Sequence, residues 1–435
     1  MTDDPSIPSP AFEDMARRWA LPKSLLGGTA VMQAMGTRFL PRHPAENETV
    51  YRERANRTVL RNYFGQTVRK LVGRVFAEPI RASSDMPDGI QNQFRNIDLM
   101  GRGLNVFAKA WFEDALVCGL SHVLVDFPTG GGGVGRPYAV HVPAENLIAA
   151  RWHLNGSNHE LVQVRIREGG REYHGNRERV VPQIRVLAPD HWTVWRQDEK
   201  GRWQCREEGE NSLGRIPLVT LYTNRTGFMQ AAPPLEDLAY LNLEHYQIRS
   251  DQRNALNVAS FPILAAAGYD PELDGPIEVG PNKVLTTSDT DGKYYYVEST
   301  GAALEAGARE LAHLEKAMQM FGLQFEAGAI GETATGRALD ARDALSPLIG
   351  MAQELEDSLN LMLALFGSWS GLEAVGRLSV SADPLKGGAG GTDVGHLLSL
   401  RQMGEITPET LQAELAVRGI FKSASSFNDA GSLSG

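Results

Sequence analysis

The stretch over residues 233–346 alternates helical and extended patterns, and the rest of the chain is arranged around it. A first helix is predicted over about 234–258. Its first half has one apolar stripe, because apolar side chains recur at spacings of three and seven: Leu235, Leu238, Leu241 and Ile248. Residues 249–254 are all polar, so no side of the helix there can pack in an ordinary core. At 1.5 Å per residue this helix would span roughly 37 Å, which is long enough to connect two packed layers.

A small excursion with strands is predicted after this helix. Residues 283–286 and 293–297 read as strands, and the polar turn 288–292 between them ends in glycine, which is typical of a hairpin. Residues 263–266 are a third strand candidate. The excursion is too small for a large core, so we expect it to gain burial from another chain.

Two more helices follow, with a loop between them. Apolar residues at spacings of seven, three and four predict a helix over about 302–322: Leu304, Leu311, Leu314 and Met318. Residues 323–335 contain glycines and few large apolar side chains, which predicts a mobile loop. A long helix from about 335 to 366 comes next, and Pro347 should kink it, because its ring displaces a backbone hydrogen bond.

The first half of the chain predicts an α+β lobe. Residues 51–72 predict one helix with apolar positions on one side and arginines on the other. That basic face is either solvated or a contact with nucleic acid or an acidic neighbouring subunit. A helix over 104–120 is expected to end at Gly119 as its C-cap. A largely antiparallel sheet follows, with a charged turn at 167–171. Its strands are expected at 122–126, 138–142, 161–166, 183–187, 192–195 and 218–222.

The two ends of the chain differ from the middle. Several prolines in residues 1–45 predict an arm, with one short helix at 12–19, that is partly ordered on a neighbouring surface. Residues 381–422 predict a glycine-rich linker and two short helices. The Ser/Gly-rich tail 423–435 is predicted to be disordered.

Composition restricts the class of protein. The 435 residues exceed the size of a single core, so two or more lobes are expected. The net charge of -10 argues against a free-standing DNA binder, which is usually basic. Cys118 and Cys205 are too few for a disulfide framework or a cysteine metal site, and this fits a reducing cytoplasm. No apolar run approaches the roughly 20 residues of a membrane helix, and the first residues lack a signal pattern, so we expect neither secretion nor membrane insertion.

Catalytic motifs are not evident in the sequence. There is no HExxH, GxSxG or CxxC, and the histidines lack metal-ligand spacing. The strand ending at Asp126 and the glycines at 130–133 are reminiscent of a nucleotide site. However, the chain has no GxxxxGK followed by Ser or Thr, and Pro128 and Pro137 place these glycines at a hairpin tip. His122 is expected to be a core histidine with satisfied ring nitrogens. We therefore expect no enzyme, no metal and no cofactor.

Several short segments occur in a specific order and spacing. They are YRERA (51–55), NYF (62–64), LVGRVF (71–76), LVDFP (124–128), RPY (136–138), PAEN (143–146), RW (151–152), PPLEDLA (233–239), LNLEHY (241–246) and TGRALD (335–340). With these segments the chain resembles the bacteriophage portal proteins, in particular the portal-like group long labelled a domain of unknown function (DUF4055). The resemblance extends over almost the whole chain.

The resemblance implies a portal fold with a helical C-terminal crown. Its parts would be an N-terminal arm (1–45), a mixed α/β wing (46–232), two stem helices (233–262 and 302–322), a small β-containing clip (263–301), a tunnel loop (323–335), a kinked long helix (336–380), crown helices (381–422) and a disordered tail (423–435). It implies a dodecameric ring at one capsid vertex of the virion, assembled in the bacterial host cytoplasm. The implied partners are the terminase large subunit, the major capsid or scaffold protein, a head-completion adaptor, and double-stranded DNA that passes through the channel without sequence specificity. No membrane partner is implied.

Three groups of candidate residues follow from this comparison. The stem or channel candidates are Arg249, Asp251, Arg253 and Asn254. The tunnel-loop candidates are Gln324, Glu326, Gly328, Glu332 and Arg337. The clip candidates are Asp270, Lys283, Asp289, Asp291 and Lys293. In a ring, the polar turn at 249–254 would be paired across subunits or face channel water.

Two points depart from the family pattern. The chain is short at its C-terminus, so a small crown is expected, and the glycines at 130–133 have no counterpart. A different phage head–tail structural protein, such as an adaptor that binds only protein, is the alternative function. A nuclease or nucleotide-binding enzyme is the third.

Overall fold

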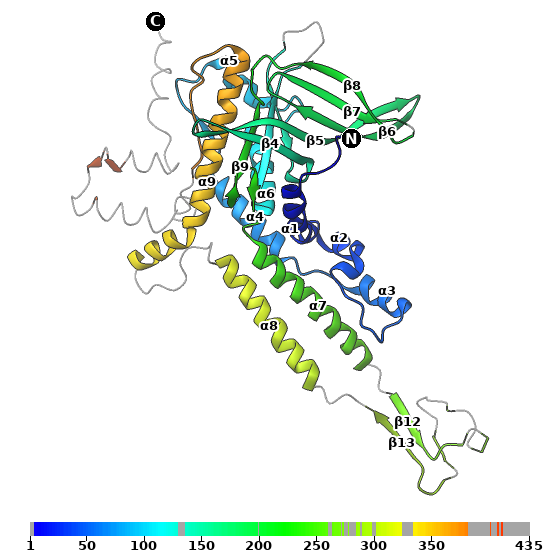
Figure 1. Cartoon of the computed structure of the whole chain (residues 1–435). Helices are drawn as coiled ribbons and strands as arrows, with labels where there is room; N and C mark the ends of the chain where they lie inside the picture. Colours follow the sequence, from blue (N-terminus) through cyan, green and yellow to red (C-terminus); the bar gives the residue numbers. More distant parts are fainter. Residues whose placement is uncertain are drawn as a thin grey trace, which may run out of the picture. The chain divides into compact units, whose positions relative to one another are not determined.

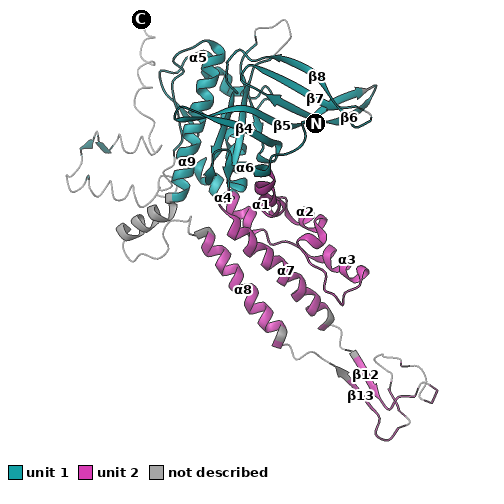
Figure 2. Ribbon diagram, in the orientation of Figure 1, with its two compact units in different colours: residues 1–12, 69–231, 325–435 teal, residues 13–68, 232–324 magenta. Residues whose placement is uncertain are grey.

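The chain divides into two compact units, which Figure 2 shows in different colours. The first comprises Met1–Phe12, Arg69–Ala231 and Phe325–Gly435, and the second comprises Glu13–Val68 and Ala232–Gln324. The computed structural model describes residues 4–128, 135–198, 200–259, 263–270, 272–273, 277, 284–287, 289–297, 302–323, 334–381, 401, 407–408 and 410–411.

The first unit is built on two antiparallel sheets (Figure 1). One has three strands in the order β3-β2-β9, and the other is a five-stranded meander in the order β4-β5-β6-β7-β8. The bounds are β2 Leu120–Asp126, β3 Tyr138–Val142, β4 Leu147–Asn155, β5 Asn158–His174, β6 Arg177–Leu187, β7 His191–Gln197, β8 Trp203–Glu210 and β9 Leu218–Tyr222. Every strand pair in the described residues is antiparallel, which confirms the predicted α+β class with an antiparallel sheet.

Helices and short ribbons complete this unit. They are α5 Asp88–Gln93, α6 Leu104–Cys118, α9 Ala334–Ser370, the ribbon of β1 Arg81–Ala82 with β14 Leu378–Ser379, the ribbon of β10 Arg225–Gly227 with β11 Gln230–Ala231, and short 3-10 turns at Phe94–Asn96 and Ala144–Asn146. The unit boundary falls within α4, Tyr63–Val75. Gly119 ends α6 with φ 92, a left-handed conformation that favours glycine, which confirms the predicted C-cap. Pro347 lies inside α9, and the bend expected there stays a prediction.

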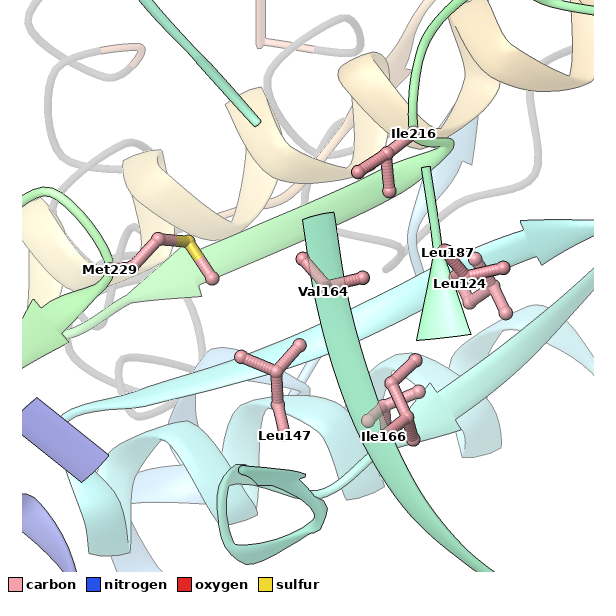
Figure 3. Close-up of a cluster of buried hydrophobic side chains, with 8 residues drawn as sticks. Leu124, Leu147, Val164, Ile166, Leu187, Ile216 and Met229 are labelled. Carbon is pink, nitrogen blue, oxygen red and sulfur yellow. The ribbon is translucent and has the colours of Figure 1, made fainter. Parts of the chain in front are cut away.

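A hydrophobic cluster joins the two sheets (Figure 3). It combines side chains of the three-stranded sheet, the meander and the segments that flank β9: Leu124, Val142, Leu147, Val164, Ile166, Leu187, Ile216 and Met229. Full burial of one such side chain stabilises the fold by about 1.5–3 kcal/mol relative to exposure. This cluster therefore holds the meander on the central sheet.

The second unit contains an antiparallel pair of long helices, α7 Glu236–Ala259 and α8 Ala302–Leu323 (Figure 1). These agree with the helices predicted over 234–258 and 302–322. The chain between them forms β12 Ile263–Ala267 and β13 Lys293–Val297, which pair with each other. The smaller helices of the unit are α1 Pro10–Leu26, α2 Gly28–Ala34 and α3 Glu48–Arg57, with a 3-10 turn at Gly36–Arg38.

The N-terminal segment is more ordered than the predicted arm. Its one expected short helix is replaced by α1 and α2. Trp19 is 2% exposed, and Leu25 and Met32 are fully buried. Their burial removes large apolar surfaces from water, so the segment has core positions of its own despite its prolines.

The single helix predicted over 51–72 is wrong, because two helices, α3 and α4, occupy this region. Asn62 starts the second one: its Oδ1 accepts from Gly65 N at 2.7 Å, as an N-cap does. Thr58 Oγ1 donates to Arg54 O at 2.7 Å at the end of the first. Local side-chain bonds therefore interrupt a sequence whose apolar spacing continues.

Two strand predictions also need correction. The charged segment 167–171 is no turn but the middle of β5, where it pairs with β6. Charged side chains are tolerated there because most of these residues are exposed. In the second unit β13 pairs with β12 rather than with 283–286, and residues 284–287 form no strand. All three segments have strand-like sequences, and periodicity alone does not choose the partner.

Several predictions fall on residues that the structure does not describe. These are the hairpin tip Gly130–Gly133, residues 382–400 with most of 401–422, and the tail 423–435.

Candidate functional site

The polar band of α7, residues 249–254, is bonded to other helices of its own unit. Ser250 is 2% exposed, and its Oγ accepts from Arg54 Nη1 of α3 at 3.2 Å. Gln252 Nε2 donates to the carbonyl oxygen of Leu304 on α8 at 2.6 Å. The expectation that only neighbouring subunits or water satisfy this band is therefore wrong for these side chains. The chain itself supplies their partners through α3 and α8.

Arg54 is the centre of this network. Its side chain is 6% exposed and that of Glu46 is 8% exposed, and Arg54 Nε and Nη2 donate to the two Glu46 oxygens at 2.8 and 2.9 Å. Nη2 also donates to Pro41 O at 2.9 Å, and Nη1 lies 3.4 Å from Asp251 Oδ1. The hydrogen bond from Arg54 lowers the pKa of Glu46, and the same bond raises the pKa of Arg54. This arginine of the predicted basic face is thus structural and not solvated.

A pocket of about 430 Å³ lies beside Arg54, between α3 and α7. It is lined by Arg54, Arg57, Thr58, Ser250, Arg253, Asn254, Leu256 and Asn257. Among these lining residues three are arginines and none is acidic. Arg54 is committed to Glu46, whereas Arg57 and Arg253 are exposed. Their guanidinium groups can bind a phosphate or a carboxylate through charge-assisted hydrogen bonds.

A second polar cluster holds α7 against α8. His245 is fully buried, and its Nε2 lies 3.1 Å from Glu315 Oε1. Arg61 Nη1 pairs with the same oxygen, and the Tyr63 ring meets His245 edge-on with centroids 5.9 Å apart. Burial lowers the pKa of His245, although the bond to Glu315 acts the other way. Burial acts to raise the pKa of Glu315, but hydrogen bonds from His245 and Arg61 outweigh it and lower that pKa.

The structure places the four stem candidates in different surroundings. Arg253 and Asn254 line the pocket, and Asp251 lies beside Arg54. Arg249 has a buried Nη1 with no hydrogen-bond partner among the described residues. Burial lowers the pKa of Arg249, and the positive charges of Arg61 and Arg253 lower it further.

The described clip candidates lie at or near the ends of β12 and β13. Lys293 is the first residue of β13. Asp289 Oδ1 accepts from Asp291 N at 2.9 Å, and Asp270 Oδ1 accepts from a backbone N–H two residues further on at 2.9 Å. These carboxylates shape tight turns. Lys283 lies outside the described residues.

The tunnel-loop candidates lie outside the described part of the chain, so no geometry is assigned to Gln324, Glu326, Gly328 and Glu332. Arg337 belongs to α9, but its side chain is also outside that part.

In the first unit the polar residues singled out from the sequence are structural. His122 is fully buried, with Nδ1 2.9 Å from Thr220 Oγ1, and burial lowers its pKa to about 3. This confirms a core histidine, but Nε2 has no partner within the described residues, contrary to the expectation that both nitrogens are satisfied. Asp126 accepts from Tyr138 Oη at 3.2 Å and from Arg185 Nη1 at 3.0 Å, so it ties β2 to the meander.

Arg54 and Arg57 belong to the predicted basic face of residues 51–72, but the sequence did not place them in one pocket with Arg253. Their spacing of three places both on one side of α3, and this was the available signal. The partner of Arg54 on α7, Ser250, lies 196 residues further along the chain, so no local pattern identifies it.

The described residues offer no metal site, since no group of three or more His, Cys, Asp or Glu side chains is arranged to hold an ion. Within the same residues no helix is long and apolar enough to span a membrane.

Comparison with protein families gives one match. The model described as a domain of unknown function (DUF4055) matches residues 234–370. The matched region contains α7, β12, β13, α8 and α9. No curated protein matches the sequence.

Solved structures of gene transfer agent (GTA) particles are also similar to this chain. A chain from the neck of an empty GTA particle, computed with C6 symmetry, has a TM-score of 0.45 and 12% identity, covering 91% of this chain and 99% of that chain. Chains from the virion of a native GTA particle and from a native neck computed with C12 symmetry each have a TM-score of 0.43, 12% identity and the same coverage.

Proposed function

We propose that this chain is a bacteriophage portal protein. It forms one subunit of a ring at a capsid vertex, through which the terminase motor packages double-stranded DNA and through which the DNA later exits. The observation that carries the proposal is the succession of elements in residues 234–370: α7, the β12–β13 ribbon, α8 and α9. The resemblance implies a stem helix, a clip, a second stem helix and a long helix in this order, and the DUF4055 match falls on the same segment.

The polar surface of the helix pair supports a role inside an assembly. α7 carries exposed charged side chains along most of its length, including Asp237, Glu244, Asp251 and Arg253. Such a surface suits contact with charged neighbours or with a water-filled channel. The net charge of -10 suits a channel in which DNA must slide and not be held.

A structural role, with no catalytic step, metal or cofactor, is part of the proposal. The sequence has none of the catalytic motifs considered above, and this supports it. The terminase large subunit, the major capsid or scaffold protein and a head-completion adaptor are the proposed partners, and the dodecameric ring belongs to the capsid vertex of the virion after assembly in the host cytoplasm. A head–tail adaptor that binds only protein is the second candidate, favoured by the acidic charge balance.

The first test is the mass and shape of the purified full chain. Mass photometry and images along the particle axis should show a closed ring with a central opening. A monomer at every concentration would refute the portal proposal.

The second test is DNA packaging by procapsids that contain this chain. Arg253→Glu, in the basic pocket, should reduce ring assembly or packaging. Arg17→Glu on α1 is the matched control, since that arginine is 71% exposed and, among the residues the structure describes, pairs with Asp14 on the same helix. If the wild-type chain forms rings but procapsids that contain them take up no DNA, the result would favour the head–tail adaptor function.

A further inference from the structure

One face of α7 is acidic and exposed. Asp237, Glu244 and Asp251 recur every seven residues, and all three are exposed. Seven residues make nearly two helical turns, so these side chains share a face, on which Tyr240 is also 59% exposed. Glu244 makes no ion pair with any described residue. Asp251 pairs with Arg54 at 3.4 Å but stays 75% exposed, so its carboxylate is still accessible from outside.

α8 carries a basic face with the same repeat. Arg309 and Lys316 are seven residues apart and both are exposed. Within the described part of the chain neither is in an ion pair. Met320 lies one turn beyond Lys316 and is 54% exposed. The second unit therefore presents two faces of opposite charge.

Neither face is turned toward the other helix of the same chain. Glu244 and Asp251 each precede by one residue a side chain that contacts α8, His245 in the first case and Gln252 in the second. One residue turns a helix by about 100°, so both acids point sideways, roughly perpendicular to the direction of α8. On α8, Lys316 likewise follows the contacting residue by one position. The two faces are thus directed to the flanks of the helix pair, where a second copy can reach them.

The charged residues of the two faces also match in their position along the axis of the α7–α8 pair. Because α7 and α8 are antiparallel, the contact between His245 and Glu315 marks one level along the pair. Glu244 stands one residue before His245, and Lys316 stands one residue after Glu315. Both therefore lie at the same level, about 1.5 Å from that contact.

The next positions along the helices keep this match. Seven residues further along α7 and seven residues back along α8 bring Asp251 level with Arg309. Four residues in the opposite direction bring Tyr240 level with Met320, a contact that aromatic rings and thioethers favour. Glu305, an acid beyond this region of α8, lies level with an alanine of α7. Opposite charges therefore meet at both paired levels.

We propose that the acidic face of α7 binds the basic face of α8 in a second copy of this chain, with Glu244 on Lys316 and Asp251 on Arg309. Copies related by rotation about an axis along the helix pair stay at one height, so levels that match within the chain also match between neighbours. The two faces are different surfaces, so the contact is head-to-tail, and its repetition closes a ring when the rotation between copies divides a full turn. This inference rests on the proposed function and adds to it the residues that hold the ring together.

The test is charge reversal with rescue in a mixture. Glu244→Lys alone and Lys316→Glu alone each place like charges at every interface. Each should raise the concentration for half-assembly by about tenfold at low salt, and the wild-type assembly should weaken as salt is added. An equimolar mixture of the two variants allows opposite charges at every contact of an alternating ring, so it should assemble at nearly the wild-type concentration. Glu310→Lys, an exposed reversal on another side of α8, is the matched control and should assemble normally.

Mass photometry of the full chains gives distinct outcomes. Rescue in the mixture supports the pairing between copies, because a contact within one chain could not be repaired by a second chain. If the wild-type chain forms rings and both single charge reversals also assemble normally, this inference would be overturned, whereas the ring proposal would stand. Loss of assembly without rescue would also overturn the pairing. A wild-type monomer at all concentrations would overturn the ring itself.

Discussion

Replacing Arg54 with methionine is the sharpest test of the network that ties α3 to α7. The substitution leaves the Glu46 carboxylate, 8% exposed, without the cation that donates two hydrogen bonds to it. Breaking a buried ion pair from one side costs about 3–5 kcal/mol. Since Asp251, which also pairs with Arg54, is 75% exposed, the network has an edge open to solvent, and we expect the lower end, about 3 kcal/mol. For a unit of this size that corresponds to a fall of about 6–12 °C in melting temperature.

The penalty should depend on pH. Arg54 lowers the pKa of Glu46, so the pair stabilises the fold above the ordinary carboxyl pKa and this contribution is lost as pH falls through the lowered value. In Arg54→Met the unpaired Glu46 carboxylate instead becomes protonated as pH falls toward 4. The free-energy cost of burying its negative charge is then removed. Scanning calorimetry of the full chain should therefore show a difference from the wild type that is largest near pH 7 and shrinks in acid.

Arg52→Met is the matched control on the same helix. Arg52 is 74% exposed and, in the described part of the chain, pairs with Glu48 at 2.9 Å, so its loss should cost at most about 0.5 kcal/mol. Equal effects of the two substitutions, or a penalty for Arg54→Met that does not change with pH, would refute the assigned burial and pairing.

Two further changes test other parts of the fold. Burial lowers the pKa of His122 from 6.5 to about 3, so the unfolded chain binds a proton between these values that the folded chain does not, and stability falls as pH drops below 6.5. This residue should remove about 2 kcal/mol by pH 5, and denaturant titrations of His122→Asn should show a smaller difference between pH 7 and pH 5; an unchanged difference would contradict the assignment. A Cβ at Gly307 would overlap Gln252 Oε1, so in Gly307→Ala the Gln252 side chain must move from its hydrogen bond to Leu304 O, and the melting temperature should be lower than in Gly73→Ala. At Gly73 in α4 such a Cβ has no described atom within 4 Å, so Gly73→Ala should be neutral or stabilising by up to about 1 kcal/mol, and equal effects at both sites would count against the α7–α8 contact.

Local pattern predicted most of the regular elements. The spacing of Leu235, Leu238 and Leu241 identified α7, and the short apolar runs around Val123 and Val140, on either side of a glycine-rich turn, identified β2 and β3. Gly119 marked the end of α6. These predictions hold because they depend only on the periods of the helix and strand and on the conformational freedom of glycine.

The local sequence pattern did not predict which strands pair or where one helix gives way to the next. Residues 283–286 and 263–266 were both strand candidates, and only the folded chain shows that Lys293 pairs at the end of β12. Asn62 interrupts a helix whose apolar spacing runs on, because its side chain caps a new helix locally. Such choices depend on competition between segments of similar propensity.

The sequence by itself determined that this chain is an acidic α+β protein with two long polar helices separated by a small β excursion. The spacing of apolar residues, the turn residues and the charge counts depend on the sequence alone, so they can be determined without the folded structure. Only the tertiary structure decided what the polar band of α7 does. Ser250 and Gln252 are bonded within the unit, whereas Glu244 is left exposed, because helix packing turns neighbouring residues by about 100° toward different surroundings.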